Sequence, residues 1–324
     1  MHTHTSPSIP DPTPGPDPLA DVRAARAFLL RLADSPCPAL EQLVLSVGPR
    51  AAAEQLTGGE IPEDVGGYVA PARVQAAAAA AAGDGEAGAR CGARLLIPED
   101  DHWPAAYAPA GAVGLWVRGH AGLEVLSAPS ITLTGSRAAT GYGTHVAADF
   151  AAELAAAGRT TIASAGFGID AAALRGALAA HGPTVAVLAC GIDRAYPAAH
   201  ENLLERIAQS GLIVSALPPG TTPSRHRTHG WARVLAGLGE ATVVVEAAAR
   251  SGALQIAAAA RQIGRPVMAV PGPVTSAASV GTHQLIRNRA TLVTSGADVL
   301  AALAERERRA ADTAEAWGLT HQEL

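Results

Sequence analysis

The sequence contains no lysine, so arginine supplies all 24 basic residues and a lysine-dependent phosphate loop is excluded. Only 11 of the 324 residues are aromatic, which argues against a platform of many base-stacking rings. Cys37, Cys91 and Cys190 form no Cys-x-x-Cys pair, so they provide neither a disulfide framework nor a zinc site. No apolar run approaches the roughly 18 residues that span a bilayer, and no targeting segment is evident. We therefore expect a cytoplasmic globular protein without a metal, a cofactor or a membrane partner.

Charge is unevenly distributed along the chain, although the net charge is only −5. Residues 131–300 carry 13 arginines against 9 acidic residues, whereas the segments on both sides are acidic. A basic central segment within an acidic chain is compatible with an anionic ligand. Ordinary solvated charge would explain the same pattern equally well.

Composition predicts the domain organisation. Residues 1–18 are rich in proline and predict a disordered tail. Residues 19–90 show helical periodicity interrupted by prolines, which predicts a small helical domain. Residues 91–304 form the main predicted domain, and residues 305–324 form a short charged C-terminal helix.

The main domain alternates short β-branched runs with alanine-rich helical segments, the rhythm of a parallel sheet with crossover helices. Strands are expected at 131–134, 160–163, 184–189, 212–215, 242–245, 267–270 and 291–293. This pattern predicts an α/β fold with a Rossmann-like, doubly wound and mostly parallel sheet. Its ligand site is expected at the carboxyl ends of the strands.

Two glycine-rich loops follow the first two strands of this sheet. The first contains Gly135, Ser136, Arg137, Thr140, Gly141 and Gly143, and the second contains Gly166, Phe167, Gly168, Ile169 and Asp170. Backbone N–H groups and an arginine at a helix start suit a phosphate, and neighbouring strands bring such loops together. The spacing does not match the dinucleotide fingerprint. Asp170 is more typical of a helix cap than of a catalytic acid, and Phe167 fits either the core or an exposed site.

A third loop brings together Arg225, Arg227, Trp231 and Arg233, and basic residues interleaved with an aromatic suit single-stranded nucleic acid. His226 and His229 lack a third metal ligand. Further residues are expected at the edge of the site: Ser251, Gly252, Gly272, Gly281, His283 and Arg287. Glu246 ends a strand without a nucleophile or base beside it, so the sequence does not predict an enzyme.

In their order and spacing, the loops from about residue 94 to 300 resemble the DNA-processing protein A family (DprA, also called Smf). The resemblance is carried by Gly135-Ser-Arg137, Gly168-Ile-Asp170, Gly191-Ile-Asp193, Tyr196-Pro197, Pro219-Gly220, Arg233-Val-Leu-Ala-Gly-Leu238, Val245-Glu-Ala247, Ser251-Gly252, Ala269-Val-Pro-Gly272 and Gly281 with Leu285-Ile286. It implies a dimeric, extended Rossmann-like protein that binds and protects single-stranded DNA without cutting it. It also implies loading of the recombinase RecA during natural transformation (competence) or DNA recombination.

The chain departs from this family in several places. Thr228-His-Gly-Trp-Ala-Arg233 stands where the family typically has Phe-Pro-x-Arg-Asn-Arg, so the stacking aromatic is lost unless Trp231 replaces it. His283 stands where asparagine is usual, and we expect this member to lack the C-terminal winged-helix domain that many members carry. Two alternatives follow: a nucleotide-binding sensor, or a nucleotide N-glycosidic hydrolase of the same superfamily. The Pro-Gly-Gly-x-Gly-Thr-x-x-Glu motif of those hydrolases does not occur here.

Overall fold

The computed structural model describes residues 17, 19–32, 37–67, 69–104, 107, 113–224 and 228–316. Three predicted features lie partly or wholly outside this part of the chain. They are nearly all of the predicted N-terminal tail, the pair Arg225 and Arg227, and the last eight residues of the predicted C-terminal helix.

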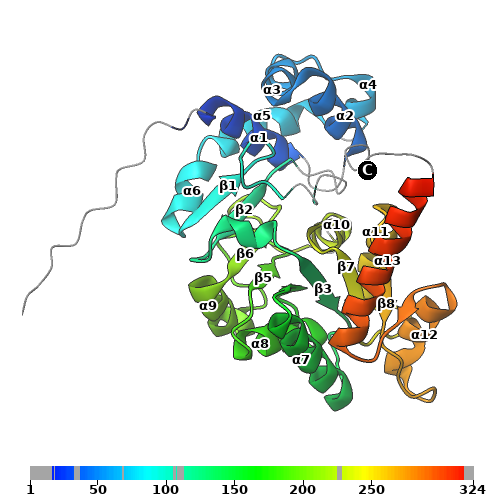
Figure 1. Cartoon of the computed structure of the whole chain (residues 1–324). Coiled ribbons are helices and arrows are strands. Elements are labelled where there is room, and N and C mark those ends of the chain that lie inside the picture. Colours follow the sequence, from blue (N-terminus) through cyan, green and yellow to red (C-terminus); the bar gives the residue numbers. More distant parts are fainter. Residues whose placement is uncertain are drawn as a thin grey trace, which may run out of the picture.

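Helices form the N-terminal part of the structure (Figure 1). They are α1 (Ala20–Leu32), α2 (Pro38–Val47), α3 (Pro49–Thr57), α4 (Glu63–Gly66), α5 (Pro71–Ala81) and α6 (Asp84–Arg90). Prolines occupy the first turns of α2, α3 and α5, where a missing N–H costs nothing. Helix α1 packs against α3 and α5 and buries Phe28, Leu29 and Leu30. Their apolar core continues into the edge of the sheet through Leu95 and Trp116.

A nine-stranded sheet with the order β1-β2-β6-β5-β4-β3-β7-β8-β9 forms the centre of the molecule (Figure 1). Its strands are β1 (Ala93–Leu96), β2 (Leu115–Arg118), β3 (Ser130–Thr134), β4 (Thr160–Ser164), β5 (Thr184–Val187), β6 (Leu212–Ser215), β7 (Ala241–Val244), β8 (Val267–Ala269) and β9 (Thr291–Leu292). Strands β3 to β9 pair in parallel, whereas β2 pairs antiparallel with both β1 and β6. The predicted doubly wound, mostly parallel α/β fold is confirmed. Four predicted strands are too long. β5 ends at Val187 rather than at residue 189, and β7, β8 and β9 each end one residue before the predicted position, at Val244, Ala269 and Leu292.

Helices cover both faces of the sheet. They are α7 (Gly141–Ala156), α8 (Ile169–Ala179) and α9 (Glu201–Ser210) on one face, and α10 (Thr228–Leu238) and α11 (Ala253–Gln262) on the other. Helix α12 (Val280–Arg287) contacts β8, and short 3₁₀ helices lie at Leu123–Leu126, Ala198–His200 and Ala277–Ser279. Side chains alternate between the faces: Ile131 and Leu133 of β3 join the core beneath α7 and α8, whereas Thr132 donates to the Leu235 carbonyl of α10.

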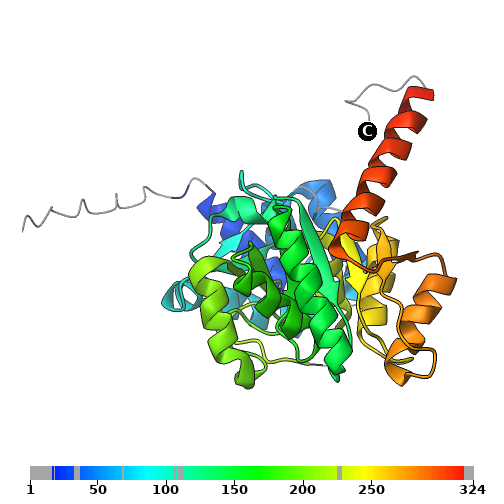
Figure 2. The same cartoon turned by 60° about the horizontal axis from the view of Figure 1, so that its bottom comes forward.

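Helix α13 (Gly296–Ala316) ends the described part of the chain and projects from the body of the molecule (Figure 2). Its first turns contact α7 and bury Val299 and Leu303. The charged helix predicted from residue 305 is therefore the second half of a longer helix. The start at Gly296 follows from a local cap. The Ser295 hydroxyl accepts a hydrogen bond from the Asp298 N–H, and the Asp298 carboxylate accepts in return from the N–H and hydroxyl of Thr294.

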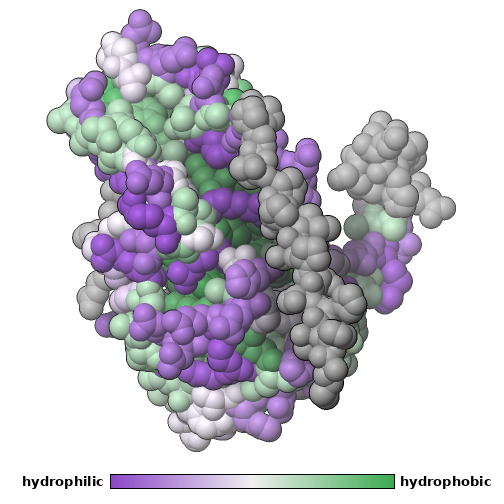
Figure 3. All heavy atoms as spheres, turned by 90° about the vertical axis from the view of Figure 1, so that its left-hand side faces the viewer, coloured by the Kyte–Doolittle hydropathy of each residue, from purple (hydrophilic) through white to green (hydrophobic). Residues whose placement is uncertain are grey.

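The surface seen in Figure 3 intersperses hydrophilic and hydrophobic residues. Across the described residues, no helix has both the length and the apolar character needed to cross a membrane.

Candidate nucleic-acid interface

The chain reverses its direction of travel across the sheet between β3 and β7, because β4, β5 and β6 lie on one side of β3 and β7, β8 and β9 lie on the other. The loops that leave such neighbouring strands in opposite directions open a crevice at the carboxyl edge of the sheet. A cavity of about 730 Å³ lies there, which we call the cradle. Its lining includes Gly135, Ser136, Arg137, Gly166, Phe167, Asp170, Trp231, Ser251 and Gly252 from the predicted site.

Asp170 joins the two glycine-rich loops. One carboxylate oxygen accepts hydrogen bonds from the Thr134 hydroxyl (3.0 Å) and the Gly135 N–H (3.1 Å). The other accepts from the Ser164 N–H (3.1 Å) and the Ser164 hydroxyl. Its side chain is buried, and burial raises the pKa of Asp170 to about 6 although the four hydrogen bonds limit that rise. Asp170 therefore connects β3 to β4 and does not serve as a simple helix cap.

The Gly-Ser-Arg turn is held by backbone contacts. The Ser136 N–H donates to the Glu246 carbonyl (2.7 Å), and the Ile169 N–H donates to the Ser136 carbonyl (3.2 Å). Gly168, with φ of 78°, lies so close that a Cβ atom there would be 2.2 Å from the Ser136 carbonyl oxygen. Close packing of this kind leaves room only for glycine.

Glu246 supports the same turn from behind. Its carboxylate accepts hydrogen bonds from the Thr140 hydroxyl (2.5 Å) and the Thr140 N–H (2.9 Å), and its side chain is only 3% exposed. The Thr140 hydroxyl in turn accepts from the Gly143 N–H and caps α7, while Gly141 begins that helix. A Cβ atom on Gly143 would lie 2.3 Å from the Glu246 carboxylate. Glu246 thus fixes the start of α7 and does not line the cradle.

Positive charge is exposed at the cradle. Arg137 and Arg250 both line it and are exposed, and neither forms a hydrogen bond or ion pair with its side chain in the described part of the chain. Ser136 and Ser251 add hydroxyl groups to the same wall. An uncommitted guanidinium beside hydroxyl and N–H donors suits a phosphate.

A second cavity, of about 330 Å³, adjoins the cradle and shares Arg137, Ser164, Gly166, Phe167 and Trp231 with it. The alternatives for Phe167 are resolved: the residue is 45% exposed and lines both cavities. Trp231 is half-buried, and its indole nitrogen is 3.5 Å from the Val187 carbonyl oxygen.

The predicted basic loop is shorter than the sequence suggested, because α10 begins at Thr228. Trp231 and Arg233 are therefore helical, and two residues along a helix differ by about 200° in direction. Arg233 lines neither cavity. Burial raises the pKa of Glu41 and of Tyr107, and the positive charge of Arg233 lowers both pKa values in part. Arg225 and Arg227 lie outside the described residues.

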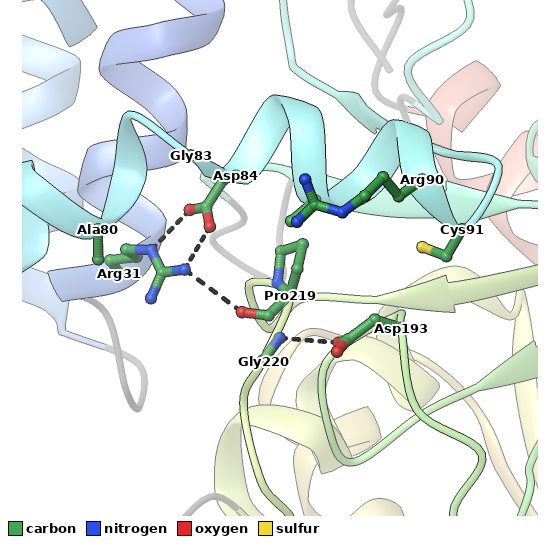
Figure 4. A pocket seen from close by; sticks show the side chains of 10 residues that line it. Arg31, Ala80, Gly83, Asp84, Arg90, Cys91, Asp193, Pro219 and Gly220 are labelled. Carbon is green, nitrogen blue, oxygen red and sulfur yellow. Dashed lines mark hydrogen bonds and ion pairs between the residues drawn. The ribbon is translucent and has the colours of Figure 1, made fainter.

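The start of this loop is fastened to the helical domain by Arg31 and Asp84, which sequence reasoning missed (Figure 4). Arg31 of α1 pairs with the buried carboxylate of Asp84, and its Nη2 also donates to the Pro219 carbonyl (3.3 Å). The Gly220 N–H donates to the Asp193 carboxylate (2.8 Å). Arg31 and Pro219 are 188 residues apart, so no local pattern could have linked them.

The remaining predicted residues lie behind or beside the cradle. Gly272, Gly281, His283 and Arg287 line neither cavity. The Gly281 N–H donates to the Ala247 carbonyl (2.7 Å), and the ring nitrogen Nε2 of His283 is 2.9 Å from the Gly272 carbonyl oxygen. These contacts brace the loops after β7 and β8 against α12. Among the described residues, no three His, Cys, Asp or Glu side chains gather as metal ligands would.

Comparison with known proteins adds an independent finding. The model of the family described as DNA recombination-mediator protein A matches residues 94–304. The DNA processing protein DprA of Mycobacterium tuberculosis H37Rv is 43% identical over 289 residues, covering 85% of this chain and 74% of that protein. The X-ray structure of DprA from Streptococcus pneumoniae matches with a TM-score of 0.73 and 29% identity, covering 87% of this chain and 97% of that one. DprA from Helicobacter pylori, described for its single-stranded DNA binding mode, has the same fold (TM-score 0.56, 22% identity, 66% and 96% covered).

Proposed function

Because the chain belongs to the DNA recombination-mediator protein A family, we propose that it binds single-stranded DNA, with the backbone phosphates held in the cradle. The match to the family model and to the Mycobacterium tuberculosis relative confirms the resemblance predicted from the loops, and the chain is a DNA-processing protein. Single-stranded DNA is what the Helicobacter pylori relative is described as binding.

The observation that carries this proposal is the uncommitted Arg137 side chain at the centre of a rigid turn. Asp170 and Glu246 fix the turn from two sides, whereas Arg137 is exposed and forms no ion pair with a described acidic residue. Order in the backbone combined with a free cation is the arrangement of a preorganised anion site. Exposed Arg250 on the opposite loop provides a second charge for a neighbouring phosphate.

Binding should be sensitive to salt, since it depends on phosphates. If about four phosphates are neutralised, log affinity for oligo-dT should fall against log salt with a slope near −3, at about −0.7 per phosphate. Arg137→Ala should raise Kd about ten-fold and make the slope shallower by about 0.7 because one charged contact is lost. Fluorescence anisotropy of a labelled oligo-dT across salt concentrations measures both quantities.

Arg206→Ala is the matched control, because Arg206 is an exposed arginine of α9 that lines neither cavity. It removes the same charge and should leave Kd within about two-fold, as expected for screened charges at a distance. Wild-type affinity that does not change with salt would overturn the proposal. Saturable binding of a mononucleotide without binding of oligonucleotides would favour a nucleotide sensor instead.

We propose that this binding involves no bond cleavage. Glu246, the candidate acid of a nucleotide hydrolase, is buried and has both carboxylate oxygens engaged by Thr140. Release of free base from a nucleoside monophosphate, lost in Glu246→Gln, would contradict this.

Two partners complete the proposal: a second copy of the chain, and the recombinase RecA. The sheet ends at β9, where both residues are exposed and Leu292 is 50% exposed. Such an edge suits pairing with another copy. Sedimentation should report a dimer for wild type and a monomer for Leu292→Glu. For the second partner, wild type should speed RecA filament formation on oligo-dT, whereas Arg137→Ala should not.

A further inference from the structure

We propose that Arg31 of the helical domain (α1 to α6) is a positioning residue for DNA binding. It holds the loops after β5 and β6 in the place from which they reach the DNA-binding edge of the sheet. This inference rests on the proposed binding of single-stranded DNA. It gives a role to the helical domain, which contributes no residue to the lining of the cradle.

The loops after β5 and β6 are tied to each other where they leave the sheet. The Gly191 N–H donates to the Thr221 carbonyl (2.9 Å), and the Gly220 N–H donates to the Asp193 carboxylate (2.8 Å). A Cβ atom on Gly191 would lie 2.7 Å from the Pro218 carbonyl oxygen, so the two loops are closely packed. Residues 191–193 and 218–221 therefore form one unit, which we call the loop junction.

Arg31 reaches the loop junction with a side chain whose direction is already fixed. Its Nε donates to one carboxylate oxygen of Asp84 (2.6 Å) and its Nη2 to the other, and the same Nη2 donates to the Pro219 carbonyl (3.3 Å) (Figure 4). Asp84 is only 1% exposed, so water does not compete for its carboxylate. An arginine fork that is filled by a buried carboxylate loses little freedom when it makes a further hydrogen bond.

The hydrogen bond from Arg31 crosses open space. A cavity of about 410 Å³ lies between the helical domain and the loop junction, and Arg31, Asp84, Pro219 and Gly220 are among its lining residues. Because side chains do not fill this space, packing alone does not hold the junction against α1. The cavity shares no lining residue with the cradle or with the second cavity. Arg31 therefore acts on DNA in the cradle through the loop junction and not by contact.

Both segments of the loop junction lead into the walls of the DNA-binding site. Only two residues separate Asp193 from Tyr196, which lines the second cavity together with Pro197. The segment that contains Gly220 leads to α10, whose Trp231 lines both cavities. A displacement of the loop junction is therefore passed on to these walls, and walls held in place before binding lower its entropic cost.

The test replaces the ion pair by apolar side chains in the double variant Arg31→Met with Asp84→Leu. Exchange of a whole buried ion pair for apolar groups costs little stability, and it leaves the net charge unchanged. The donor to Pro219 is lost, so Kd for oligo-dT should rise about five-fold, as expected for one lost hydrogen bond. The slope of log affinity against log salt should stay as in wild type, since no phosphate contact is removed. Fluorescence anisotropy measures both quantities.

Arg31→Lys tests the same hydrogen bond while Asp84 stays paired, so the fold is retained even if the double variant is unstable. A lysine ammonium lacks the fork that spans two acceptors. This variant should also weaken binding without changing the slope.

The matched control is the double variant Arg26→Met with Glu99→Leu. Arg26 lies on the same helix and forms the same kind of two-point ion pair with Glu99 (3.2 and 2.6 Å), but neither residue lines the cavity at the loop junction. Arg23 pairs with Asp100 and stays in every variant, so α1 remains fastened to the loop after β1. The control should bind oligo-dT within about two-fold of wild type, as expected for a distant site.

Hydrogen exchange provides a readout that a general loss of stability would not produce. The Gly191 and Gly220 amides should exchange faster in both Arg31 variants but not in the control, because only the Arg31 variants release the loop junction. Mass spectrometry of peptides from residues 190–221 of the intact protein measures this, and circular dichroism shows that each variant is folded.

Three results would overturn the positioning role and leave the cradle intact. They are an unchanged Kd or unchanged exchange at the loop junction in the folded Arg31 variants, an equal loss of affinity in the control, and a slope shallower by about 0.7, which would mark Arg31 as a direct phosphate contact. Wild type that does not bind oligo-dT would overturn the proposed function as well.

Discussion

Asp170→Ala should lower the free energy of unfolding by about 3 kcal/mol and weaken oligo-dT binding at least as much as Arg137→Ala. In the described part of the chain, Asp170 is the only acceptor of the Gly135 N–H, and it also accepts from the Ser164 N–H. Hydroxyl groups can turn to other acceptors, but these backbone N–H groups cannot, and each unsatisfied buried donor costs about 1–3 kcal/mol. Urea unfolding at pH 7 measures the loss of stability.

The pH dependence of stability provides a second measure of Asp170. Its pKa is about 6 in the folded chain against 3.8 for the ordinary carboxyl group. Between these values the folded chain holds a proton that the unfolded chain has released, so stability should fall as pH rises from about 4 to 6. The full effect is about 3 kcal/mol, from roughly two pKa units at 1.4 kcal/mol each.

Asp170→Asn separates this effect from other carboxylates, because it keeps the side-chain size and removes the titration. Asp298 and Glu305 of α13 have lowered pKa values and act in the opposite direction, and they are common to both proteins. The difference in unfolding free energy between wild type and Asp170→Asn should therefore change steadily across pH 4–6. A constant difference would show that burial does not control the ionisation of Asp170.

The seven parallel strands were predictable because a buried parallel strand reads as a short β-branched run, and each such run here is followed by a helical segment. The cradle was predictable for a related reason: parallel strands place the loops after Thr134 and Ser164 at one edge of the sheet. Local sequence and topology therefore agree at Gly135, Ser136, Arg137 and the loop that ends at Asp170.

Pairings across long stretches of chain were not predictable. Strand β2 joins the same sheet through β6, although Trp116 and its partner Ser215 are about a hundred residues apart. The direction of Arg233 depends on where α10 begins, and the basic composition of that segment masked its helical start. Composition reports which residues a segment carries, whereas the direction of each side chain depends on the exact helical register.

Gly168→Ala should lower the free energy of unfolding by about 4 kcal/mol and abolish binding to oligo-dT. Gly168 has φ of 78° and ψ of −127°, a conformation that costs other residues about 1–3 kcal/mol. Its added Cβ would also lie 2.2 Å from the Ser136 carbonyl oxygen and 2.5 Å from that of Arg137. Both are backbone atoms, so relief requires the phosphate-binding turn itself to move, at a further cost of about 1–3 kcal/mol.

Gly264→Ala separates backbone strain from this contact. Gly264 has nearly the same φ, 74°, but a Cβ atom there would meet nothing within 4 Å, and the residue lies in the turn before β8, at the opposite edge of the sheet from the cradle. Gly264→Ala should lower the free energy of unfolding by only about 1 kcal/mol and leave Kd for oligo-dT unchanged. If the two variants lost equal stability and both bound DNA, the fit between Gly168 and the Gly-Ser-Arg turn would not be what holds the cradle in shape. Loss of binding in Gly168→Ala alone would show that Arg137 needs the turn beneath it as much as its own charge.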